Sequence, residues 1–397
     1  MFSTRTNWKL AHNRLTQALE QARASGKQIL DLTASNPTRV ALEYDDGTIL
    51  SALASPSSLD YDPQAKGLLE ARASVAAYYR AEHAASIDPD RIILTTSTSE
   101  GYSYVFRLLC NAGDEILVPK PSYPLFEFLA DLQDVRLIPY PLLYDHGWQI
   151  DFHSLGRAVT PRTRAVVLVH PNNPTGSYVK SGEVSQLNQF CRDHNLALIV
   201  DEVFLDYRLT QAPTNDDGFG TFAGNRDALT FTLSGLSKIS ALPQMKVAWT
   251  VITGPEATVV EATVVEATAR LEVIADTYLS MNAPIQWAMH TLLEQRKTIQ
   301  SQLLDRVTKN LHELDRQLAA QKICSRLDVE GGWYAVLRIP VTQSDEDCVI
   351  HLVEEKSVLV HPSHFYDFPS DGYLILSLIT PEKDFAEGVT RTLQIFV

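Results

Sequence analysis

Cysteine is scarce in this sequence, and long apolar runs are absent. The four cysteines, Cys110, Cys191, Cys324 and Cys348, are scattered among 397 residues with no CxxC spacing. This pattern favours reduced, buried thiols over disulfides and predicts no metal site. No run of eighteen apolar residues occurs, and the N-terminus has no apolar segment of signal-peptide length. The sequence therefore predicts a cytoplasmic protein without a membrane-spanning segment.

Basic residues are also in the minority, with 34 lysines and arginines against 48 aspartates and glutamates. The formal net charge of −14 argues against nucleic acid or an anionic membrane as a general partner. Hydrophobic residues make up 45% of the chain and charged residues 21%, as in ordinary globular proteins. The length favours two or three domains over a single small core.

Short apolar segments alternate with amphipathic ones between residues 91 and 234. We expect strands at residues 91–96, 115–119, 135–142, 165–171, 197–204 and 228–234, and helices at residues 99–113, 123–133 and 183–195. Such alternation predicts βαβ units and a largely parallel sheet that is buried on both faces. Helices are also expected at residues 8–25 and 68–82, where apolar residues recur at helical spacing.

The pattern changes after Trp249. The five-residue unit EATVV occurs twice in succession and is too short for a solenoid repeat, so we interpret it as the start of a long helix that ends near Met281. A second helical stretch at residues 285–318 follows, and then a mixture of strands with a closing helix, which predicts a smaller α+β domain. We expect a large domain of residues 48–283 and a small domain of residues 1–47 and 284–397.

A single lysine stands shortly after the β-prone segment of residues 229–233. The segment is followed by Ser-Gly and then by Lys238 among small and hydroxylic residues. The carboxyl end of a strand is where an α/β sheet presents its chemistry. Partial desolvation there lowers the pKa of a lysine, so that its amine can attack a carbonyl and hold it as an imine. An isolated Ser-Lys pair more often marks a solvated loop. A catalytic role for Lys238 therefore depends on other motifs in the sequence.

Three motifs occur in order: PNNPTG at residues 171–176, DEVF at residues 201–204 and SGLSK at residues 234–238. With them the chain resembles the fold-type I pyridoxal-phosphate enzymes, in particular the aspartate-aminotransferase-like class I/II aminotransferases, over nearly its whole length. The resemblance implies an α/β fold with a mostly parallel, seven-stranded sheet sandwiched by helices and a smaller α+β domain. It also implies an aminotransferase that holds pyridoxal 5'-phosphate as a Schiff base on Lys238 and performs a 1,3-proton transfer.

By this resemblance, Asn173 donates to the phenolate oxygen of the cofactor. Asp201 is a catalytic residue that pairs with the protonated pyridine nitrogen, and this pairing keeps the ring an electron sink. Tyr123 stacks on the ring, and Thr98 and Ser99 bind the phosphate at a helix N-terminus. Without a ligand, the same residues could serve as a turn, as helix caps and as a half-buried core tyrosine.

The resemblance gives a phosphate contact to Lys246 as well. A further family contact is a serine three residues before Lys238, where this chain has Gly235, and the nearby Ser237 could substitute for it. Lys246 stands where the family has an arginine, and it keeps the charge but loses the bidentate fork. Ser237 could instead only cap the helix beside it. Tyr61 matches a tyrosine that reaches the phosphate of the neighbouring subunit, which implies a homodimer with shared active sites.

Two departures from the family pattern affect the chemistry. Phe204 replaces a tyrosine that donates to the phenolate oxygen, so the pKa of the imine should rise. Ile375 stands where an arginine clamps the substrate α-carboxylate, so the usual anchor for an amino acid is absent.

Either the substrate presents no carboxylate at that position, or another cation such as Arg39 has taken over the clamp. Asn36 and Arg39 lie in the segment that lines the substrate mouth in the family. Arg338, His361 and His364 are further candidates, although surface arginines and structural histidines are the commoner case.

We expect Lys238 to anchor the cofactor and to be the catalytic base that removes the α-proton of an amine or amino-acid substrate, with a keto acid as amino acceptor. Loss of the carboxylate clamp leaves a pyridoxal-phosphate lyase or decarboxylase on the same fold as an alternative. A second alternative is a non-catalytic, effector-binding protein with an aminotransferase-like fold. Such folds occur as modules of regulators that bind DNA, and the acidic composition of this chain argues against DNA binding.

Overall fold

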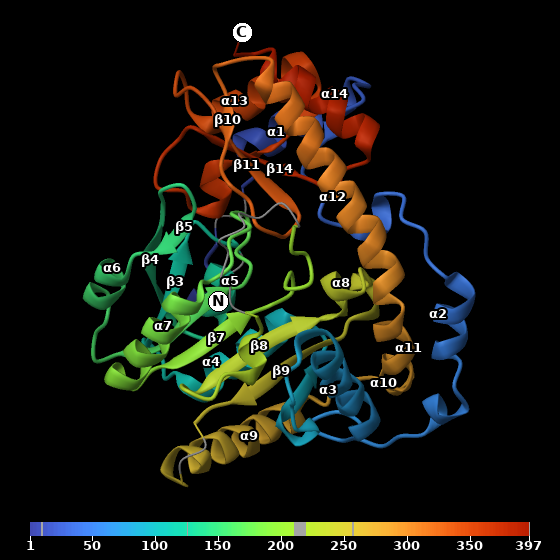
Figure 1. Cartoon of the computed structure of the whole chain (residues 1–397), viewed down its shortest axis with the longest axis vertical. Coiled ribbons are helices and arrows are strands. Elements are labelled where there is room, and N and C mark those ends of the chain that lie inside the picture. Colours follow the sequence, from blue (N-terminus) through green and yellow to red (C-terminus); the bar gives the residue numbers. More distant parts are fainter. Residues whose placement is uncertain (9–10, 125, 210–219, 256–257, 397) are drawn as a thin grey trace.

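An eight-stranded sheet forms the centre of the large part of the molecule (Figure 1). The computed structural model describes residues 1–8, 11–124, 126–209, 220–255 and 258–396. The strands lie in the order β2-β9-β8-β7-β6-β3-β4-β5. Their bounds are β2 (Ile92–Thr95), β3 (Glu115–Lys120), β4 (Arg136–Tyr144), β5 (Trp148–Ile150), β6 (Thr163–Val169), β7 (Ala197–Asp201), β8 (Thr230–Gly235) and β9 (Ala248–Thr253).

Most of this sheet is parallel, as predicted. Strands β8, β7, β6, β3 and β4 pair in parallel, β9 lies antiparallel between β2 and β8, and β5 lies antiparallel to β4. The sheet has eight strands rather than seven, because the three-residue strand β5 extends its edge. Strand β9 is absent from the predicted strands, because the change of pattern was placed after Trp249. In the structure the buried apolar segment continues to Thr253 and forms this strand.

Helices cover both faces of the sheet, because alternate residues of a strand point to opposite sides. On one face, Ala165 and Val167 belong to a core cluster with residues of α4, α5 and α9, and on the other, Val166 and Leu168 pack with residues of α7. The helices are α3 (Leu69–His83), α4 (Thr98–Leu109), α5 (Phe126–Leu132), α6 (Phe152–Arg157), α7 (Ser181–His194), α8 (Leu236–Ile239) and α9 (Thr258–Tyr278). Within the described ranges, no helix has both the length and the apolar character to cross a bilayer.

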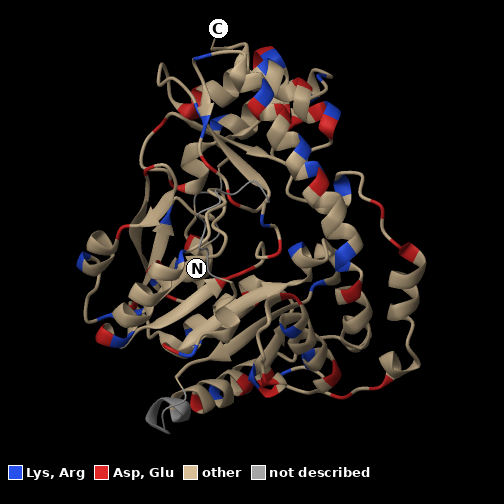
Figure 2. Cartoon of the chain, viewed as in Figure 1, with Lys and Arg blue, Asp and Glu red and all other residues tan. Residues whose placement is uncertain are grey.

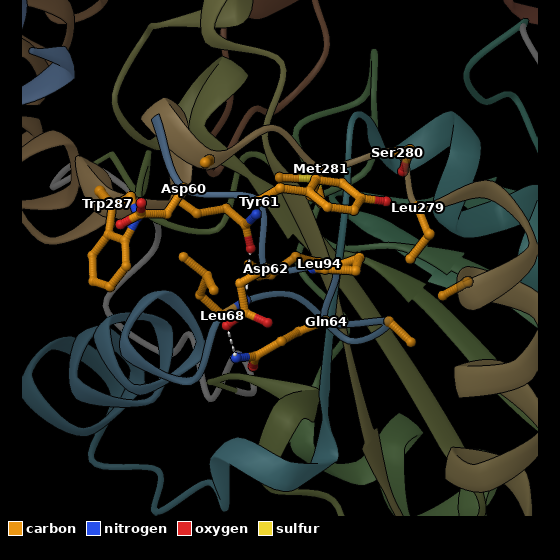
Figure 3. A pocket seen from close by; sticks show the side chains of 15 residues that line it. Asp60, Tyr61, Asp62, Gln64, Leu68, Leu94, Leu279, Ser280, Met281 and Trp287 are labelled. Carbon is orange, nitrogen blue, oxygen red and sulfur yellow. Dashed lines mark hydrogen bonds between the residues drawn. The ribbon is translucent and has the colours of Figure 1, made fainter. Parts of the chain in front are cut away.

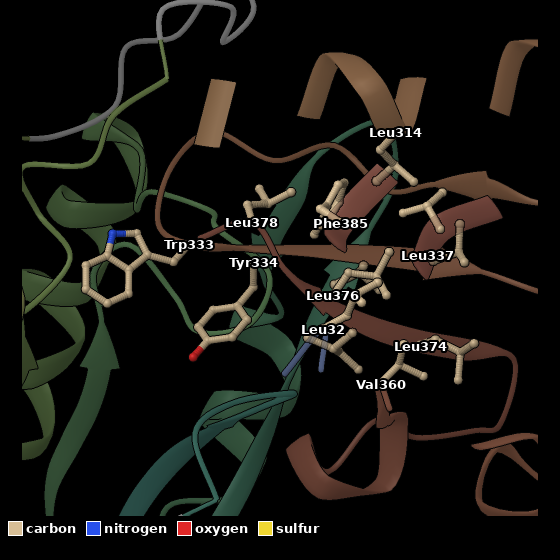
Figure 4. Close-up of a cluster of buried hydrophobic side chains, with 14 of the residues drawn as sticks. Leu32, Leu314, Trp333, Tyr334, Leu337, Val360, Leu374, Leu376, Leu378 and Phe385 are labelled. Carbon is tan, nitrogen blue, oxygen red and sulfur yellow. The ribbon is translucent and has the colours of Figure 1, made fainter. Parts of the chain in front are cut away.

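The small part of the molecule, at the top of Figure 1, is built on a four-stranded sheet of order β10-β11-β14-β13 and a two-stranded sheet of β1 and β12. The chain's N-terminal arm belongs to it, because β1 pairs in parallel with β12 and Leu32 lies in its apolar core (Figure 4). The elements are α1 (Arg14–Ala24), β1 (Leu30–Asp31), β10 (Ser325–Arg326), β11 (Tyr334–Arg338), α13 (Asp345–His351), β12 (Val358–Leu359), β13 (His361–Pro362), β14 (Tyr373–Ser377) and α14 (Glu382–Leu393).

The long helices differ from the predicted ones at their ends. Helix α3 matches its prediction, whereas α1 begins only at Arg14, because the side chain of Asn13 caps it by accepting from Thr16 N. Residues 9–10 of that predicted helix, and residues 256–257 at the start of the EATVV repeat, lie outside the described residues. The stretch predicted at residues 285–318 is three helices, α10 (Ala283–Trp287), α11 (Met289–Glu294) and α12 (Arg296–Ala319).

Helix α12 joins the two parts of the molecule (Figure 1). Its N-terminal neighbours α10 and α11 pack beside α3, and Met289 and Leu292 share a core cluster with Val75 of that helix. Farther along α12, Leu303 and Leu311 belong to the core of the small part. Figure 2 shows charged residues of both signs mixed along outer helices such as α12 and α14. The division into domains at residues 47/48 and 283/284 stays a prediction.

Candidate active site

The carboxyl ends of three parallel strands meet at one edge of the large sheet. Val169 on β6 is the register partner of Asp201 on β7, which is in turn the partner of Leu233 on β8. Strand β9 begins at the same edge, because its first residue Ala248 pairs with Thr95 at the end of β2. A cavity of about 410 Å³ opens here, where ligands of open α/β sheets bind.

Most of the residues predicted for the site line this cavity. The segments after β2, β3, β6, β7 and β8, and the one before β9, bring together Thr98, Ser99, Tyr123, Asn173, Asp201, Ser237, Lys238 and Lys246. His361 also lines it, from the small part of the molecule. The other candidates do not: Asn36, Arg39, Tyr61, Arg338, His364 and Ile375.

Lys238 lies on the short helix α8, directly after β8. Its Nζ is 4.9 Å from the ring centre of Trp333, 5.6 Å from that of Phe204 and 3.4 Å from the backbone oxygen of Ser35. Burial lowers the pKa of Lys238 to about 8, and the negative charge of Asp201 opposes this shift. About one side chain in ten is therefore a free amine at pH 7, against about one in three thousand at the ordinary pKa of 10.5, and the free amine is the form that a nucleophile or a base requires.

Asp201 is the last residue of β7, and only 7% of it is exposed. Its carboxylate accepts hydrogen bonds from Val203 N (3.1 Å) and from the hydroxyl of Tyr102 (3.3 Å). Burial raises the pKa of Asp201 to about 6, although these two hydrogen bonds and Lys238 lower it. A carboxyl group in this setting is held as the anion when a cation is brought next to it, and a protonated pyridine nitrogen is such a cation.

Asn173 lies in the turn that follows β6. Its side chain is buried, and Oδ1 has no hydrogen-bond partner among the residues that the structure describes. The turn is closed by Gly176, which has a φ of +70° and whose position leaves no room for a Cβ between Val329 and the backbone oxygen of Gly331. The turn thus fixes an amide whose hydrogen-bonding capacity is unused within the protein, as a ligand-binding residue would be.

The opposite end of the cavity favours an anion. Thr98 and Ser99 form the first turn of the 12-residue helix α4, whose N-terminus carries partial positive charge. Ser97 caps this helix by accepting from Glu100 N (3.2 Å). Lys246 adds a positive charge from the segment before β9.

These groups fit pyridoxal phosphate. The cavity has the volume of a small-molecule site. Hydroxyls, a helix N-terminus and Lys246 would hold the phosphate. The buried carboxyl of Asp201 would pair with the ring nitrogen, and Asn173, whose Oδ1 is unpaired within the described protein, would donate to the ring oxygen through Nδ2. Tyr123 is 41% exposed and lines the same cavity, so its ring is free to stack on a planar ligand.

Several lining residues were missed by sequence reasoning. Tyr334, on β11, and Phe365 and Tyr366, on the 3-10 helix η8 (Ser363–Tyr366), face the cavity from the small part of the molecule. Tyr102, which binds Asp201, was also missed. The crowding of aromatic residues in the segment HPSHFYDF, residues 361–368, was the available signal, but no spacing rule connects it with Lys238.

Tyr61 lies in a different pocket, shown in Figure 3 between Asp60, Met281 and Leu279. It is 85% exposed. Asn36 accepts from Thr38 N (3.1 Å) at the start of the 3-10 helix η2 (Pro37–Arg39), in which Arg39 is exposed.

Ile375 is only 1% exposed and belongs to the apolar core of the small part. Its register partners are Val336 on β11 and His361 on β13. The structure therefore gives Ile375 a packing position next to the site, and it lines no part of the cavity.

The proteins that this chain resembles are aminotransferases, in agreement with a site that fits pyridoxal phosphate. The family described as aminotransferase class I and II matches residues 27–383. The glutamate-pyruvate aminotransferase AlaA of Haemophilus influenzae is 27% identical over 364 residues, which cover 89% of this chain and 87% of that protein. The alanine aminotransferase of Mycobacterium tuberculosis is 27% identical over 379 residues, covering 93% of this chain and 85% of that protein.

Solved structures show the same fold. The alanine aminotransferase of Pyrococcus furiosus superposes with a TM-score of 0.87 at 21% identity, over 100% of this chain and 99% of that one. A mutant aspartate aminotransferase of Thermus thermophilus gives a TM-score of 0.83 at 22% identity, over 100% and 99%. The lyase, decarboxylase and effector-binding alternatives are not favoured by these relatives. The chain belongs to the class I and II aminotransferases, and it is a pyridoxal-phosphate-dependent aminotransferase.

Proposed function

We propose that Lys238 holds pyridoxal phosphate as a Schiff base and that the enzyme moves an amino group from an amino acid or related amine to a carbonyl acceptor. One observation carries the proposal: a half-buried lysine with a pKa lowered to about 8 shares a cavity with the buried acid Asp201 and with Asn173, whose amide oxygen is unpaired. The printed names of the relatives, glutamate-pyruvate and alanine aminotransferase, support an amino-acid donor and a keto-acid acceptor for this class of site.

Lys238 also acts as the catalytic base. With cofactor and substrate bound, the free Nζ of Lys238 would accept the proton from the substrate α-carbon and donate it again to complete a 1,3-proton transfer. The lowered pKa suits both steps, because the amine is available as a base and its ammonium form is still a competent acid. The rings of Trp333 and Phe204 lie 4.9 and 5.6 Å from Nζ, within the range of a cation–π interaction with its ammonium form.

Asp201 and Asn173 orient and tune the ring. When bound, pyridoxal phosphate supplies an electron sink that stabilises negative charge at the substrate α-carbon. Asp201 would hold a proton on the ring nitrogen, and Asn173 would donate to the phenolate oxygen. Phe204 offers no second donor to that oxygen, which leaves Asn173 with this task. Tyr123 would stack on the ring.

Thr98, Ser99, Ser237 and Lys246 are the proposed phosphate contacts. The helix N-terminus and Lys246 together supply positive charge, and the hydroxyls supply donors.

A homodimer is part of the proposal. Tyr61 is exposed and lies outside the cavity of its own chain, together with the exposed side chains of Leu59 and Trp287. We propose that this face packs against a second copy, so that Tyr61 of each subunit reaches the phosphate of the other. We place the enzyme in the cytoplasm, in keeping with its four free cysteines.

The experiment that tests the proposal is a single-turnover reaction of the loaded enzyme with a panel of amines and amino acids. We expect donors to convert the cofactor to its amine form, seen by absorbance, with one equivalent of carbonyl product and no release of ammonia or carbon dioxide. Lys238→Ala should bind the cofactor and fail to convert it. Ammonia or carbon dioxide formed in step with turnover would contradict the proposal.

A further inference from the structure

Four aromatic side chains line the side of the cavity that the small part of the molecule provides. We define Tyr334, His361, Phe365 and Tyr366 as the aromatic wall. The ring centres of His361 and Phe365 lie 5.7 Å apart, those of His361 and Tyr366 5.7 Å, and those of Tyr334 and Tyr366 6.3 Å. In Figure 4 the hydroxyl of Tyr334 points away from the leucine cluster around Leu337 and Leu376.

The aromatic wall is fixed against the sheet edge that carries the cofactor residues. The backbone oxygen of Tyr366 accepts from Ser122 N (3.0 Å), beside Tyr123. Asp367 forms an ion pair with Lys120 at the end of β3 (3.1 Å). The wall therefore has a defined position beside Tyr123.

The wall offers hydrogen bonding without charge. His361 Nδ1 lies 3.1 Å from the hydroxyl of Tyr366. Burial lowers the pKa of His361 to about 4, so the imidazole is neutral near pH 7, although Asp31 opposes this shift. If Tyr366 donates to Nδ1, then Nε2–H is free to donate, and if Nδ1–H donates to Tyr366, the phenol keeps its own proton for another acceptor. In either arrangement the pair has one donor to give to a ligand.

The aromatic wall itself carries no lysine or arginine. Among the described lining residues, the positively charged side chains are Lys238 and Lys246, and both have proposed roles toward the cofactor. Arg39 is exposed on η2, outside the lining. Arg338 lies over the rings of Tyr144 and Tyr373, 6.0 and 5.9 Å from their centres. A carboxylate at the aromatic wall would be desolvated without a cation to compensate it.

We propose that the aromatic wall selects a primary amine whose body is apolar or aromatic and which carries an uncharged hydrogen-bond acceptor where an ordinary amino acid carries its α-carboxylate. This inference rests on the proposed function and narrows its substrate class. Aromatic faces pack against the apolar body, and the His361–Tyr366 pair donates to a hydroxyl, carbonyl or amide oxygen.

A binding experiment on the cofactor-loaded enzyme tests the wall without turnover. Calorimetry would compare 3-phenylpropanamide with 3-phenylpropanoate, which have similar shapes and differ in charge. We expect the amide to bind at least about tenfold more tightly. His361→Arg, which places a cation in the wall, should reverse the preference. Tyr366→Phe should weaken amide binding about fivefold through the lost hydroxyl, and it controls for a misfolded arginine variant.

Equal or tighter binding of the acid to the unaltered enzyme overturns the inference. So does an unchanged preference in a His361→Arg variant that still folds and holds its cofactor. A parallel single-turnover comparison of 2-phenylethylamine with L-phenylalanine distinguishes failure of the substrate-class inference from failure of the proposed aminotransferase function. Faster conversion by L-phenylalanine contradicts the inference and leaves the aminotransferase intact, whereas conversion by no donor in the whole panel contradicts the proposed function itself.

Discussion

The hydroxyl of Tyr207 donates a 2.7 Å hydrogen bond to the backbone oxygen of Lys238. Gln300 on α12 acts in the same way on Ile239 O (2.8 Å), at the last residue of this short helix, and Tyr44 in the N-terminal arm donates to Ala241 O (2.9 Å), two residues beyond its end. The last carbonyls of a helix have no partner within it, so side chains from distant segments satisfy them here. Lys238 is therefore held in place by residues that never touch the cavity.

Tyr207→Phe removes the donor nearest the lysine. We expect the free energy of unfolding to fall by about 1 kcal/mol, the net worth of one hydrogen bond, and the rate of cofactor conversion to fall because Lys238 is less well oriented. Urea unfolding and single-turnover kinetics measure the two effects. Tyr44→Phe is the matched control, with a similar stability cost and a smaller loss of rate. If both variants lost stability and rate in the same proportion, Tyr207 would have no special relation to Lys238.

The raised pKa of Asp201 has a consequence for stability in the cofactor-free protein. Its folded-state pKa, about 6, exceeds the ordinary value of 3.8, so the folded protein keeps a proton that the unfolded chain loses. The contribution of Asp201 to the free energy of unfolding is thus largest below pH 4 and falls as the pH rises to about 6.

Asp201→Asn should remove this dependence. Between pH 4 and pH 6 we expect the difference in free energy of unfolding between variant and unaltered protein to change by up to about 3 kcal/mol in favour of the variant. Denaturant titrations across this range measure it, and comparison of the two proteins cancels other titrating groups such as Glu202, whose pKa burial also raises, to about 7. A constant difference would mean that Asp201 is charged throughout.

Tyr61→Phe tests the shared site. If Tyr61 of one subunit donates to the phosphate held by the other, losing one hydrogen bond should weaken cofactor retention by about 1 kcal/mol, or about fivefold. Equilibrium dialysis of the cofactor measures this, with Tyr373→Phe as a control far from both pockets. Dilution to monomer should also release cofactor from the unaltered protein. A monomer by light scattering that retains cofactor and full activity would contradict the dimer proposal.

Ile375→Arg should be costly. The side chain it replaces is 1% exposed and packs in the core of the small part, where a charge would be buried without a partner. We expect a loss of more than about 3 kcal/mol in the free energy of unfolding, with Ile375→Val as a conservative control that loses about 1 kcal/mol. A stable arginine variant that turns over free amino acids faster would mean that this position opens into the cavity and can hold a carboxylate.

The sequence was most informative where a motif follows a strand. Asn173, Asp201 and Lys238 could be predicted to meet because parallel strands place their carboxyl ends at one edge, and register pairing brings β6, β7 and β8 together there. Tyr334 and Tyr366 could not be predicted, since they reach the cavity from a second sheet whose placement depends on tertiary contacts such as Lys120–Asp367. The position of Ile375 could not be predicted either. Its alignment with the arginine that binds the substrate carboxylate in the family does not show that its side chain packs in the core.

Local sequence also left boundaries open. The apolar spacing of residues 285–318 suits one helix, and the breaks between α10, α11 and α12 fall at Ala288 and Gln295, where no proline or glycine marks them. Strand β9 runs antiparallel among parallel neighbours, an arrangement that its composition does not reveal.

The central claim is that Lys238 carries the cofactor, and borohydride reduction followed by peptide mapping tests it most directly. The purified, loaded protein should be yellow, should lose that colour on reduction, and should yield one modified peptide with the pyridoxyl group on Lys238. Lys246, which lines the same cavity, is the internal control for non-specific labelling. A reduced adduct on Lys246 or another lysine, or no adduct on a protein that has bound the cofactor, would contradict the account.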